Sequence, residues 1–221
     1  MAMKEAQHIP FHQAEKPSES ELEGRAAHFR QQMESRRSLR FFSDQAVPEK
    51  VIEHLIMTAS SAPSGANKQP WWFAAISNSD LKKRIRAAAE KEEMAFYSGR
   101  APEAWLKDLE PLGTDASKPF LEEAPWLIVA FKQNKGADGS KHYYVQESVG
   151  IACGFLIAAI HQAGLVTLTH TPSPMQFLAD ILERPDYEKP FLLLPVGFAA
   201  ENASVPALKK KTLEEVSGFY R

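Results

Sequence analysis

The stretch Tyr144–Ala163 (YVQESVGIACGFLIAAIHQA) decides the fold. Wound as a helix it is apolar on nearly every side, so we expect a buried helix. Its apolar part, Val149–Ile160, is too short to cross a bilayer, which takes about 20 residues. Small side chains let a neighbouring helix approach closely, and they occur at Gly150, Ala152, Gly154 and Ala158. Gly164 then ends the helix.

Helices and strands alternate around this segment. Spacing and capping residues predict helices from Ser18 or Ser20 to Ser35, behind Pro48 to Ser60, from Ser79 or Asp80 to Ala95, and behind Ser173–Pro174. Strands are predicted at Trp71–Ile76, Trp126–Phe131, Leu165–Thr169 and Phe191–Phe198. Pro195 favours an edge or a bulge for the last of these strands. Four strands alternating with helices favour a layered α/β arrangement.

Composition narrows the class of protein. The 221 residues include 44% hydrophobic and 24% charged residues, which excludes a disordered chain. The net charge of −2 provides no basic field for nucleic acid or an anionic membrane. Cys153 is the single cysteine, so no intrachain disulfide forms and a reducing compartment is permitted. We expect a cytoplasmic protein.

The N-terminal residues carry no apolar segment of the kind found in signal peptides, so we expect neither a signal peptide nor an anchor there. Residues 1–18 are polar and without periodicity, and they predict a flexible arm. Residues 19–221 are expected to form one domain, because no linker or repeat divides them.

Several motifs are missing. The chain has no G-x-G-x-x-G, no Walker A and no G-x-S-x-G, so no Rossmann site, P-loop or common hydrolase elbow is indicated. His8 and His12 have helical spacing, but Pro10 lies between them, and no metal site is expected. Cys153 lies among apolar residues and is interpreted as a packed thiol.

The positive signals are basic clusters. Arg36, Arg37 and Arg40 flank Ser38, and guanidinium groups bind phosphate through paired hydrogen bonds. A solvated basic turn is the commoner explanation of such a cluster. Lys209–Lys211 forms a second cluster with the same alternative.

Three weaker signals remain. The small residues of Ala62–Ala66 (APSGA) leave backbone N–H groups free to face a ligand, or form a plain loop. Glu93 and Tyr97 share a helix face and, with a lysine, could hold an amino-acid zwitterion, although a surface face is the default. The hydroxyls of Thr169–Thr171 face a cofactor or cap a turn. These residues predict a protein able to hold a phosphorylated ligand, and they name no reaction.

Taken together, these stretches resemble the nitroreductase superfamily of FMN flavoproteins and, within it, the soluble bacterial-type iodotyrosine deiodinases. The resemblance runs from about Ser35 to Lys211. It is carried by RRSLRFF (36–42), APSGANKQPW (62–71), EKEEMAFY (90–97), KPFLEEAP (118–125), the stretch 142–172, FLLLPVGF (191–198) and VPALKKK (205–211). It implies an α+β fold with three α/β/α layers and a mixed central sheet. It further implies a domain-swapped homodimer with FMN at the subunit interface.

The resemblance also implies site residues. Residues matching the family's FMN contacts are Arg36, Arg37, Ser38, Arg40, Pro63, Ser64, Thr169, His170, Thr171 and Lys210. Thr171 is the hydroxyl expected near flavin N5 and the catalytic candidate. Residues matching the substrate contacts are Ala66, Glu93, Tyr97 and Lys118. Two positions depart from the pattern. Lys210 stands where the family usually has an arginine, and His170 where it often has a threonine.

The implied activity is reductive dehalogenation of iodo-, bromo- or chlorotyrosine by stepwise one-electron transfer from reduced FMN. Electrons would come from NAD(P)H, directly or through a reductase, and residues 90–118 would close as a lid. One alternative is a general NAD(P)H-dependent nitroreductase or quinone reductase, which needs no zwitterion contacts. A second is a non-catalytic FMN-binding protein, which the departure at Lys210 keeps open.

Overall fold

The computed structural model describes residues 6–11 and 16–221, and the remaining part of the expected N-terminal arm lies outside them. The chain divides into two units, Met1–Ser35 and Arg36–Arg221. The first contains helix α1 (Glu19–Ser35), which has no buried residue. Ser18 precedes it as expected, and the Glu21 N–H donates to the Ser18 hydroxyl at 3.4 Å. The second unit begins at Arg36 and contains the hydrophobic core of the described residues.

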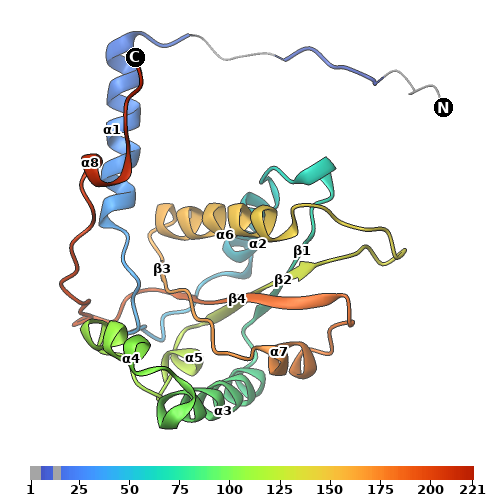
Figure 1. Cartoon of the computed structure of the whole chain (residues 1–221), viewed down its shortest axis with the longest axis vertical. Coiled ribbons are helices and arrows are strands. Elements are labelled where there is room, and N and C mark those ends of the chain that lie inside the picture. Colours follow the sequence, from blue (N-terminus) through green and yellow to red (C-terminus); the bar gives the residue numbers. More distant parts are fainter. Residues whose placement is uncertain (1–5, 12–15) are drawn as a thin grey trace. The chain divides into compact units, whose positions relative to one another are not determined.

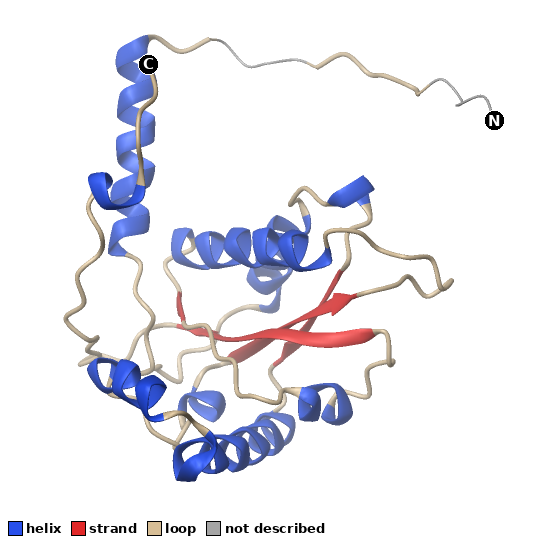
Figure 2. Cartoon of the chain, in the orientation of Figure 1, coloured by secondary structure: helices blue, strands red, loops and turns tan. Residues whose placement is uncertain are grey.

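A four-stranded sheet forms the centre of the second unit (Figure 2). Its order is β1-β2-β4-β3, and all three ladders are antiparallel. Among the described residues, the parallel pairing of the expected mixed sheet is limited to a bridge between Ser38 and Thr167. The strands are β1 (Trp71–Ile76), β2 (Trp126–Gln133), β3 (Val166–Thr167) and β4 (Glu188–Gly197).

Helices cover both faces of this sheet, which gives the three α/β/α layers of the expected fold (Figure 1). Side chains alternate along the strands, so β2 sends Ile128 and Ala130 to one face and Leu127 and Val129 to the other. The first face packs on α2 (Glu49–Ser60) and α6 (Val145–Gln162). The second packs on α3 (Ser79–Ala95), α5 (Phe120–Glu123) and α7 (Gln176–Ile181). The remaining α-helices of the unit are α4 (Glu103–Leu109) and α8 (Leu213–Val216).

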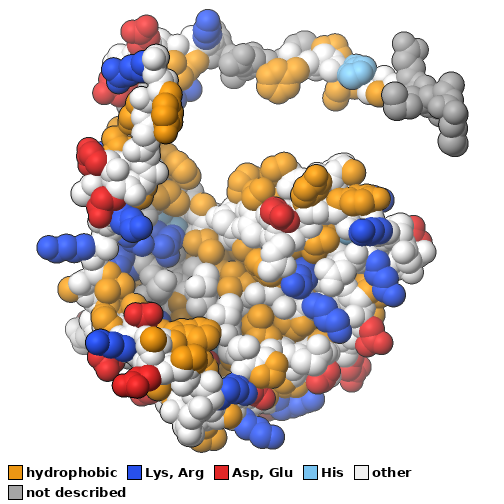
Figure 3. Space-filling view, viewed as in Figure 1, with side chains coloured by type: hydrophobic (Ala, Val, Ile, Leu, Met, Phe, Trp, Pro, Cys, Tyr) orange, Lys and Arg blue, Asp and Glu red, His pale blue; other side chains and the backbone are white. Residues whose placement is uncertain are grey.

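Helix α6 corrects one expectation, because a single chain buries only one of its faces. Val149, Ala152 and Leu156 are fully buried, whereas Ile151 and Phe155 are 43% and 41% exposed. Apolar side chains gather over the N-terminal end of α6 and the neighbouring loops (Figure 3). The apolar residues of α6 therefore form two faces, one packed in the core and one exposed on the surface of the single chain.

Smaller differences have local causes. The cap of α3 is Asn78, whose side chain accepts the Leu81 N–H at 2.9 Å, and not Ser79 or Asp80. Helix α7 begins later than expected and has no side-chain cap. Strand β4 is central, not an edge, and its Pro195 carbonyl accepts the Thr167 hydroxyl at 2.6 Å. Within residues 6–11 and 16–221, no helix combines the length and apolar character needed to span a bilayer.

Candidate functional site

Two adjoining pockets lie where α3, α4 and the end of β3 meet. The first has a volume of about 200 Å³ and is lined by Glu92, Glu93, Phe96, Tyr97, Trp105, Leu109, Thr114, Lys118, Thr169, His170, Thr171 and Ser173. The second has about 310 Å³ and is lined by Arg36, Arg37, Ser38, Arg40, Leu109, Leu112, Thr114, Thr169, Pro206, Leu208 and Lys210. Leu109, Thr114 and Thr169 line both, so the two pockets are contiguous.

Glu93 and Lys118 form an ion pair in the first pocket. The Lys118 Nζ lies 3.2 Å from the Glu93 Oε2, and the two side chains are 3% and 14% exposed. The ammonium also donates to the Thr114 hydroxyl at 3.2 Å and to the Asp115 carbonyl. An ammonium has three donors, so all of them have partners in the protein.

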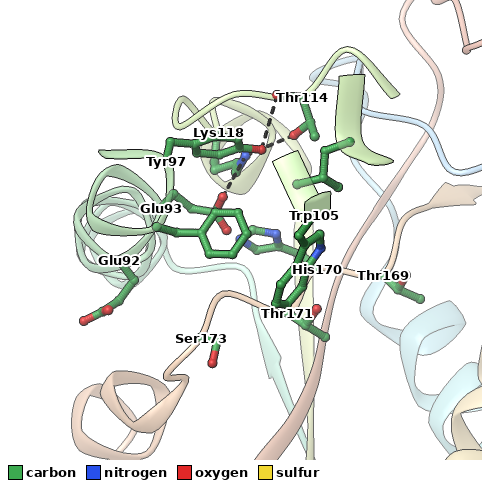
Figure 4. A pocket seen from close by; sticks show the side chains of 12 residues that line it. Glu92, Glu93, Tyr97, Trp105, Thr114, Lys118, Thr169, His170, Thr171 and Ser173 are labelled. Carbon is green, nitrogen blue, oxygen red and sulfur yellow. Dashed lines mark hydrogen bonds and ion pairs between the residues drawn. The ribbon is translucent and has the colours of Figure 1, made fainter. Parts of the chain in front are cut away.

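Tyr97 completes this group. A π-helical turn, Phe96–Arg100, follows α3 and brings Tyr97 to the side on which Glu93 lies. The Tyr97 hydroxyl donates to the Thr114 carbonyl at 3.2 Å, and the Lys118 Nζ lies 5.7 Å from its ring centre. Figure 4 shows the three side chains pointing toward one another. Partial burial, with the carboxylates of Glu93 and Asp115 nearby, raises the pKa of Tyr97, which therefore stays a neutral phenol.

The second pocket collects the basic residues. It joins Arg36, Arg37 and Arg40 to Lys210, although about 170 positions of sequence separate them. Arg37 donates a hydrogen bond to the Pro206 carbonyl, which attaches the C-terminal segment to this cluster. Lys209 and Lys211 are not among the lining residues. The arrangement offers guanidinium, ammonium and hydroxyl donors to one anionic ligand.

The segment Thr169–Thr171 alternates like a strand. Thr169 and Thr171 are exposed, whereas His170 points inward and is 7% exposed. The His170 N–H and C=O are both engaged by Leu193, at 2.8 and 3.1 Å. The backbone N–H and C=O of His170 are therefore already used by the sheet, whereas Thr169 and Thr171 are exposed.

The imidazole of His170 is buried without a polar partner. Its Nε2 has no hydrogen bond to any described residue, and its ring meets Phe120 edge-on at 5.5 Å. Burial, together with the charges of Lys118 and Arg40, lowers its pKa to about 3. The ring is therefore neutral and adds no positive charge beside Lys118 and Arg40.

Three expected site residues lie elsewhere. Among the described residues, neither pocket is lined by Pro63, Ser64 or Ala66. They belong to the turn between α2 and β1, on the side of the sheet that α6 covers, while α3 and α4 lie on the other side (Figure 1). Ala66 has a φ of 50°, in the left-handed region. One chain alone therefore does not bring together all the expected contacts.

Sequence reasoning missed several lining residues. Thr114 accepts hydrogen bonds from both Tyr97 and Lys118, and Trp105 stacks edge-on against Phe96 at 5.1 Å. Arg100 lines neither pocket of the described residues but contacts two residues that line the first, because it donates to the Glu92 carboxylate at 2.8 Å and to the Ser173 carbonyl. Arg100, Trp105 and Thr114 lie in the segment 98–117, which has mixed polarity and three turn-forming residues, Gly99, Pro102 and Gly113. Its sequence therefore indicated neither a regular element nor a site.

Comparisons with known proteins agree with this geometry. The model of the nitroreductase family matches residues 33–198. An iodotyrosine deiodinase of Haliscomenobacter hydrossis is 56% identical over 216 residues, covering 96% of this chain and 97% of the relative. The human iodotyrosine deiodinase 1 is 44% identical over 95% of this chain and 74% of its own length.

A solved structure adds to these matches. The crystal structure of an oxidized iodotyrosine deiodinase bound to FMN and 3-iodo-L-tyrosine superposes with a TM-score of 0.74 at 26% identity. The match covers 86% of this chain and all of that one. The chain therefore belongs to the nitroreductase family and, within it, to the iodotyrosine deiodinases.

Proposed function

We propose that this protein is an FMN-dependent reductive dehalogenase that converts iodotyrosine to tyrosine and iodide. The observation that carries the proposal is the group Glu93, Tyr97 and Lys118 in a pocket that adjoins a basic one. The first pocket has the charges needed for an amino-acid zwitterion. The second has the charges needed for a phosphate.

The residues of the second pocket fit FMN. Arg36, Arg37, Arg40 and Lys210 supply positive charge, and Ser38 adds a hydroxyl donor. When bound, FMN in its reduced form supplies the two electrons that, with one proton, replace the halogen by hydrogen and release halide. The Thr171 hydroxyl is exposed at the first pocket, where it is available to a flavin ring edge. We propose that it favours stepwise one-electron transfer.

A zwitterion in the first pocket would replace the ion pair between Glu93 and Lys118. Its ammonium would bind Glu93, its carboxylate Lys118, and the Tyr97 hydroxyl would add a hydrogen bond. Because the Lys118 donors are all in use, an uncharged halophenol gains nothing by opening this pair, whereas a zwitterion replaces both charges. We therefore propose halotyrosines, with iodine, bromine or chlorine, as substrates, and not simple halophenols.

A homodimer would complete the site. Pro63, Ser64 and Ala66 line neither pocket of their own described chain, so a second copy is the natural source of these contacts. The exposed face of α6 (Gly150, Ile151, Gly154 and Phe155) is apolar, and a Cβ added at either glycine would meet no atom within 4 Å. We propose that this face forms the dimer interface, that the N- and C-terminal segments are exchanged, and that FMN lies between the subunits.

Segment 90–118 is the proposed lid. It contains Glu93, Tyr97 and Lys118 together with α4, so binding of a zwitterion at these residues would order the segment over the ligand and exclude water. The electron donor is proposed to be NAD(P)H, acting directly or through a reductase, which fits the expected cytoplasmic location.

The test uses purified holoprotein under anaerobic conditions. Dithionite-reduced enzyme is mixed with 3-iodo-L-tyrosine, and tyrosine and iodide are quantified over time. Equal amounts of both products are expected, with 2-iodophenol reacting far more slowly. Rapid NAD(P)H-dependent reduction of nitroaromatics without binding of iodotyrosine would instead identify a general nitroreductase. A protein that binds no flavin would overturn the proposal.

A further inference from the structure

The Glu90 side chain contacts the backbone of Lys118, the residue that we propose binds the substrate carboxylate. Glu90 lies on α3, three residues before Glu93, and its carboxylate is not among the groups that line either pocket in the described chain. The Glu90 Oε1 accepts the backbone N–H of Lys118 at 2.7 Å. This contact joins the helix that carries Glu93 to the residue that provides the opposite charge.

Glu90 is itself held in place. The Arg86 Nε donates to it at 2.8 Å, and the second Arg86 nitrogen lies 3.2 Å from the Glu122 carboxylate. Lys82 donates to the carbonyls of Glu122 and Ala124, at 2.9 and 2.8 Å. One face of α3 therefore contacts α5 and the residues on either side of it, Lys118 and Ala124, at four points.

The Lys118 amide is a critical point of attachment. Pro119 follows it and has no N–H, so the Lys118 amide is the last backbone donor before Pro119, and its bond to Glu90 acts beside the bond that the Lys118 carbonyl accepts from the Leu121 N–H at 3.1 Å. Burial alone would raise the pKa of Glu90, but hydrogen bonds from the Lys118 amide and Arg86 outweigh it and lower that pKa. The carboxylate thus stays ionised and accepts a charge-assisted hydrogen bond, a strong type.

We infer that Glu90 is a positioning residue that sets the place of Lys118, and so the spacing of Lys118 from Glu93, for binding of the substrate carboxylate. This inference rests on the proposed function for its substrate. The role is distinct from those of Glu93 and Lys118, because Glu90 acts through the backbone and needs no contact with the ligand.

The first experiment needs no substrate. Hydrogen–deuterium exchange is followed for the Lys118 amide in the FMN-loaded wild type, Glu90→Ala and Glu90→Gln. We expect exchange at Lys118 to quicken at least tenfold in Glu90→Ala and less in Glu90→Gln, which keeps an acceptor oxygen. Asp80→Asn is the matched control, because Asp80 lies on the same helix in an exposed pair with Lys83 at 3.6 Å. Unchanged exchange in Glu90→Ala overturns the inference.

The second experiment measures binding by flavin absorbance. The dissociation constant for 3-iodo-L-tyrosine is expected to rise about tenfold in Glu90→Ala and about threefold in Glu90→Gln. Those for FMN and 2-iodophenol are expected to stay within about twofold of wild type. An equal loss for all three ligands would indicate general damage and overturn the positioning role.

A second variant and the substrate-free measurement cover two further outcomes. If Glu90→Ala does not fold, Arg86→Gln replaces it, since that change removes the second contact of Glu90 and is expected to act in the same direction. If the wild type does not bind iodotyrosine, the proposed function fails, while exchange at the Lys118 amide still decides whether Glu90 fixes this backbone.

Discussion

The Lys118 Nζ and the Glu93 Oε2 lie 3.2 Å apart in the first pocket, and the two side chains are 3% and 14% exposed. A ligand has to separate them and satisfy both charges at once. Removal of either partner leaves the other charge buried, which is costly. We therefore expect this pair to favour a zwitterion, which replaces both charges, over a ligand that carries one charge or none.

Glu93→Gln is the first prediction. The amide still accepts a hydrogen bond, but it no longer offers a negative charge to the substrate ammonium. We expect the dissociation constant for 3-iodo-L-tyrosine to rise more than tenfold, corresponding to about 1.4 kcal/mol or more, with FMN still bound. The flavin absorbance shows whether FMN is bound, and its titration with 3-iodo-L-tyrosine gives the dissociation constant. Glu53→Gln, at an exposed position on α2, is the control, and an unchanged affinity for iodotyrosine in Glu93→Gln would remove the zwitterion model.

Thr171→Ala is the second prediction. Thr171 is exposed at the first pocket, and loss of its hydroxyl removes a donor available to the flavin edge. Dehalogenation of iodotyrosine is expected to slow about tenfold or more, while reduction of a nitroaromatic by NAD(P)H continues at the wild-type rate. Thr171→Ser keeps the hydroxyl and is expected to keep the activity. Equal slowing of both reactions in Thr171→Ala would contradict a selective role.

Phe155→Glu is the third prediction. Phe155 is 41% exposed on the uncovered face of α6, and a carboxylate there would be buried without a partner in a dimer. We expect a monomer by size-exclusion chromatography with light scattering, and FMN affinity at least tenfold lower. Ala87→Glu, on the exposed side of α3, is the control. A variant that stays dimeric would place the interface elsewhere, and a monomeric wild type would overturn the proposed homodimer.

The sequence predicted well those elements that local periodicity determines. The bounds of α2, β1, α3 and α6 agree with the expected ranges within a few residues, because each has a strong apolar pattern and a clear break at its end. The apolar pattern of α6 alone did not separate its exposed face from its buried one, since an apolar side chain gives the same signal whether it meets its own core or an uncovered surface.

The site depends on contacts that periodicity does not encode. The approach of Lys210 to Arg36–Arg40 joins distant parts of the chain, and only the family resemblance suggested it. The Thr114 carbonyl accepts the Tyr97 hydroxyl and the Glu90 carboxylate accepts the Lys118 N–H, and the sequence does not reveal such contacts with backbone groups. Ala66 lines neither of the two pockets in the described part of its own chain. The sequence of a single chain therefore could not show how this residue would reach the site.

His170→Gln is the fourth prediction. The pKa of His170 is about 3 in the folded protein, against about 6.5 in an unfolded chain. Between these values the unfolded state binds more protons than the folded state, so protonation of His170 favours unfolding. The contribution of this group to the free energy of unfolding is therefore fully present above pH 6.5 and declines as the pH falls toward 3. Between pH 7 and 5 this group is expected to reduce the free energy of unfolding by about 2 kcal/mol.

Urea unfolding at pH 7, 6 and 5 measures this slope. His170→Gln is expected to show a shallower loss of stability than the wild type, while His54→Gln, at an exposed position on α2, keeps the wild-type slope. Identical slopes for the wild type and His170→Gln would mean that His170 titrates alike in the folded and unfolded states.

Lys210→Arg is the last prediction. Lys210 lines the basic pocket with Arg36, Arg37 and Arg40, where it supplies charge but not the planar fork of a guanidinium. A guanidinium at this position donates two parallel hydrogen bonds to a phosphate, so we expect FMN to bind about threefold more tightly. Lys210→Ala is expected to weaken FMN about tenfold, and Lys209→Ala, one residue away and outside the lining of that pocket, to leave it unchanged. Quenching of FMN fluorescence gives each dissociation constant. If Lys210→Ala and Lys209→Ala behave alike, the lysine does not contact the phosphate, and the three arginines alone hold the cofactor.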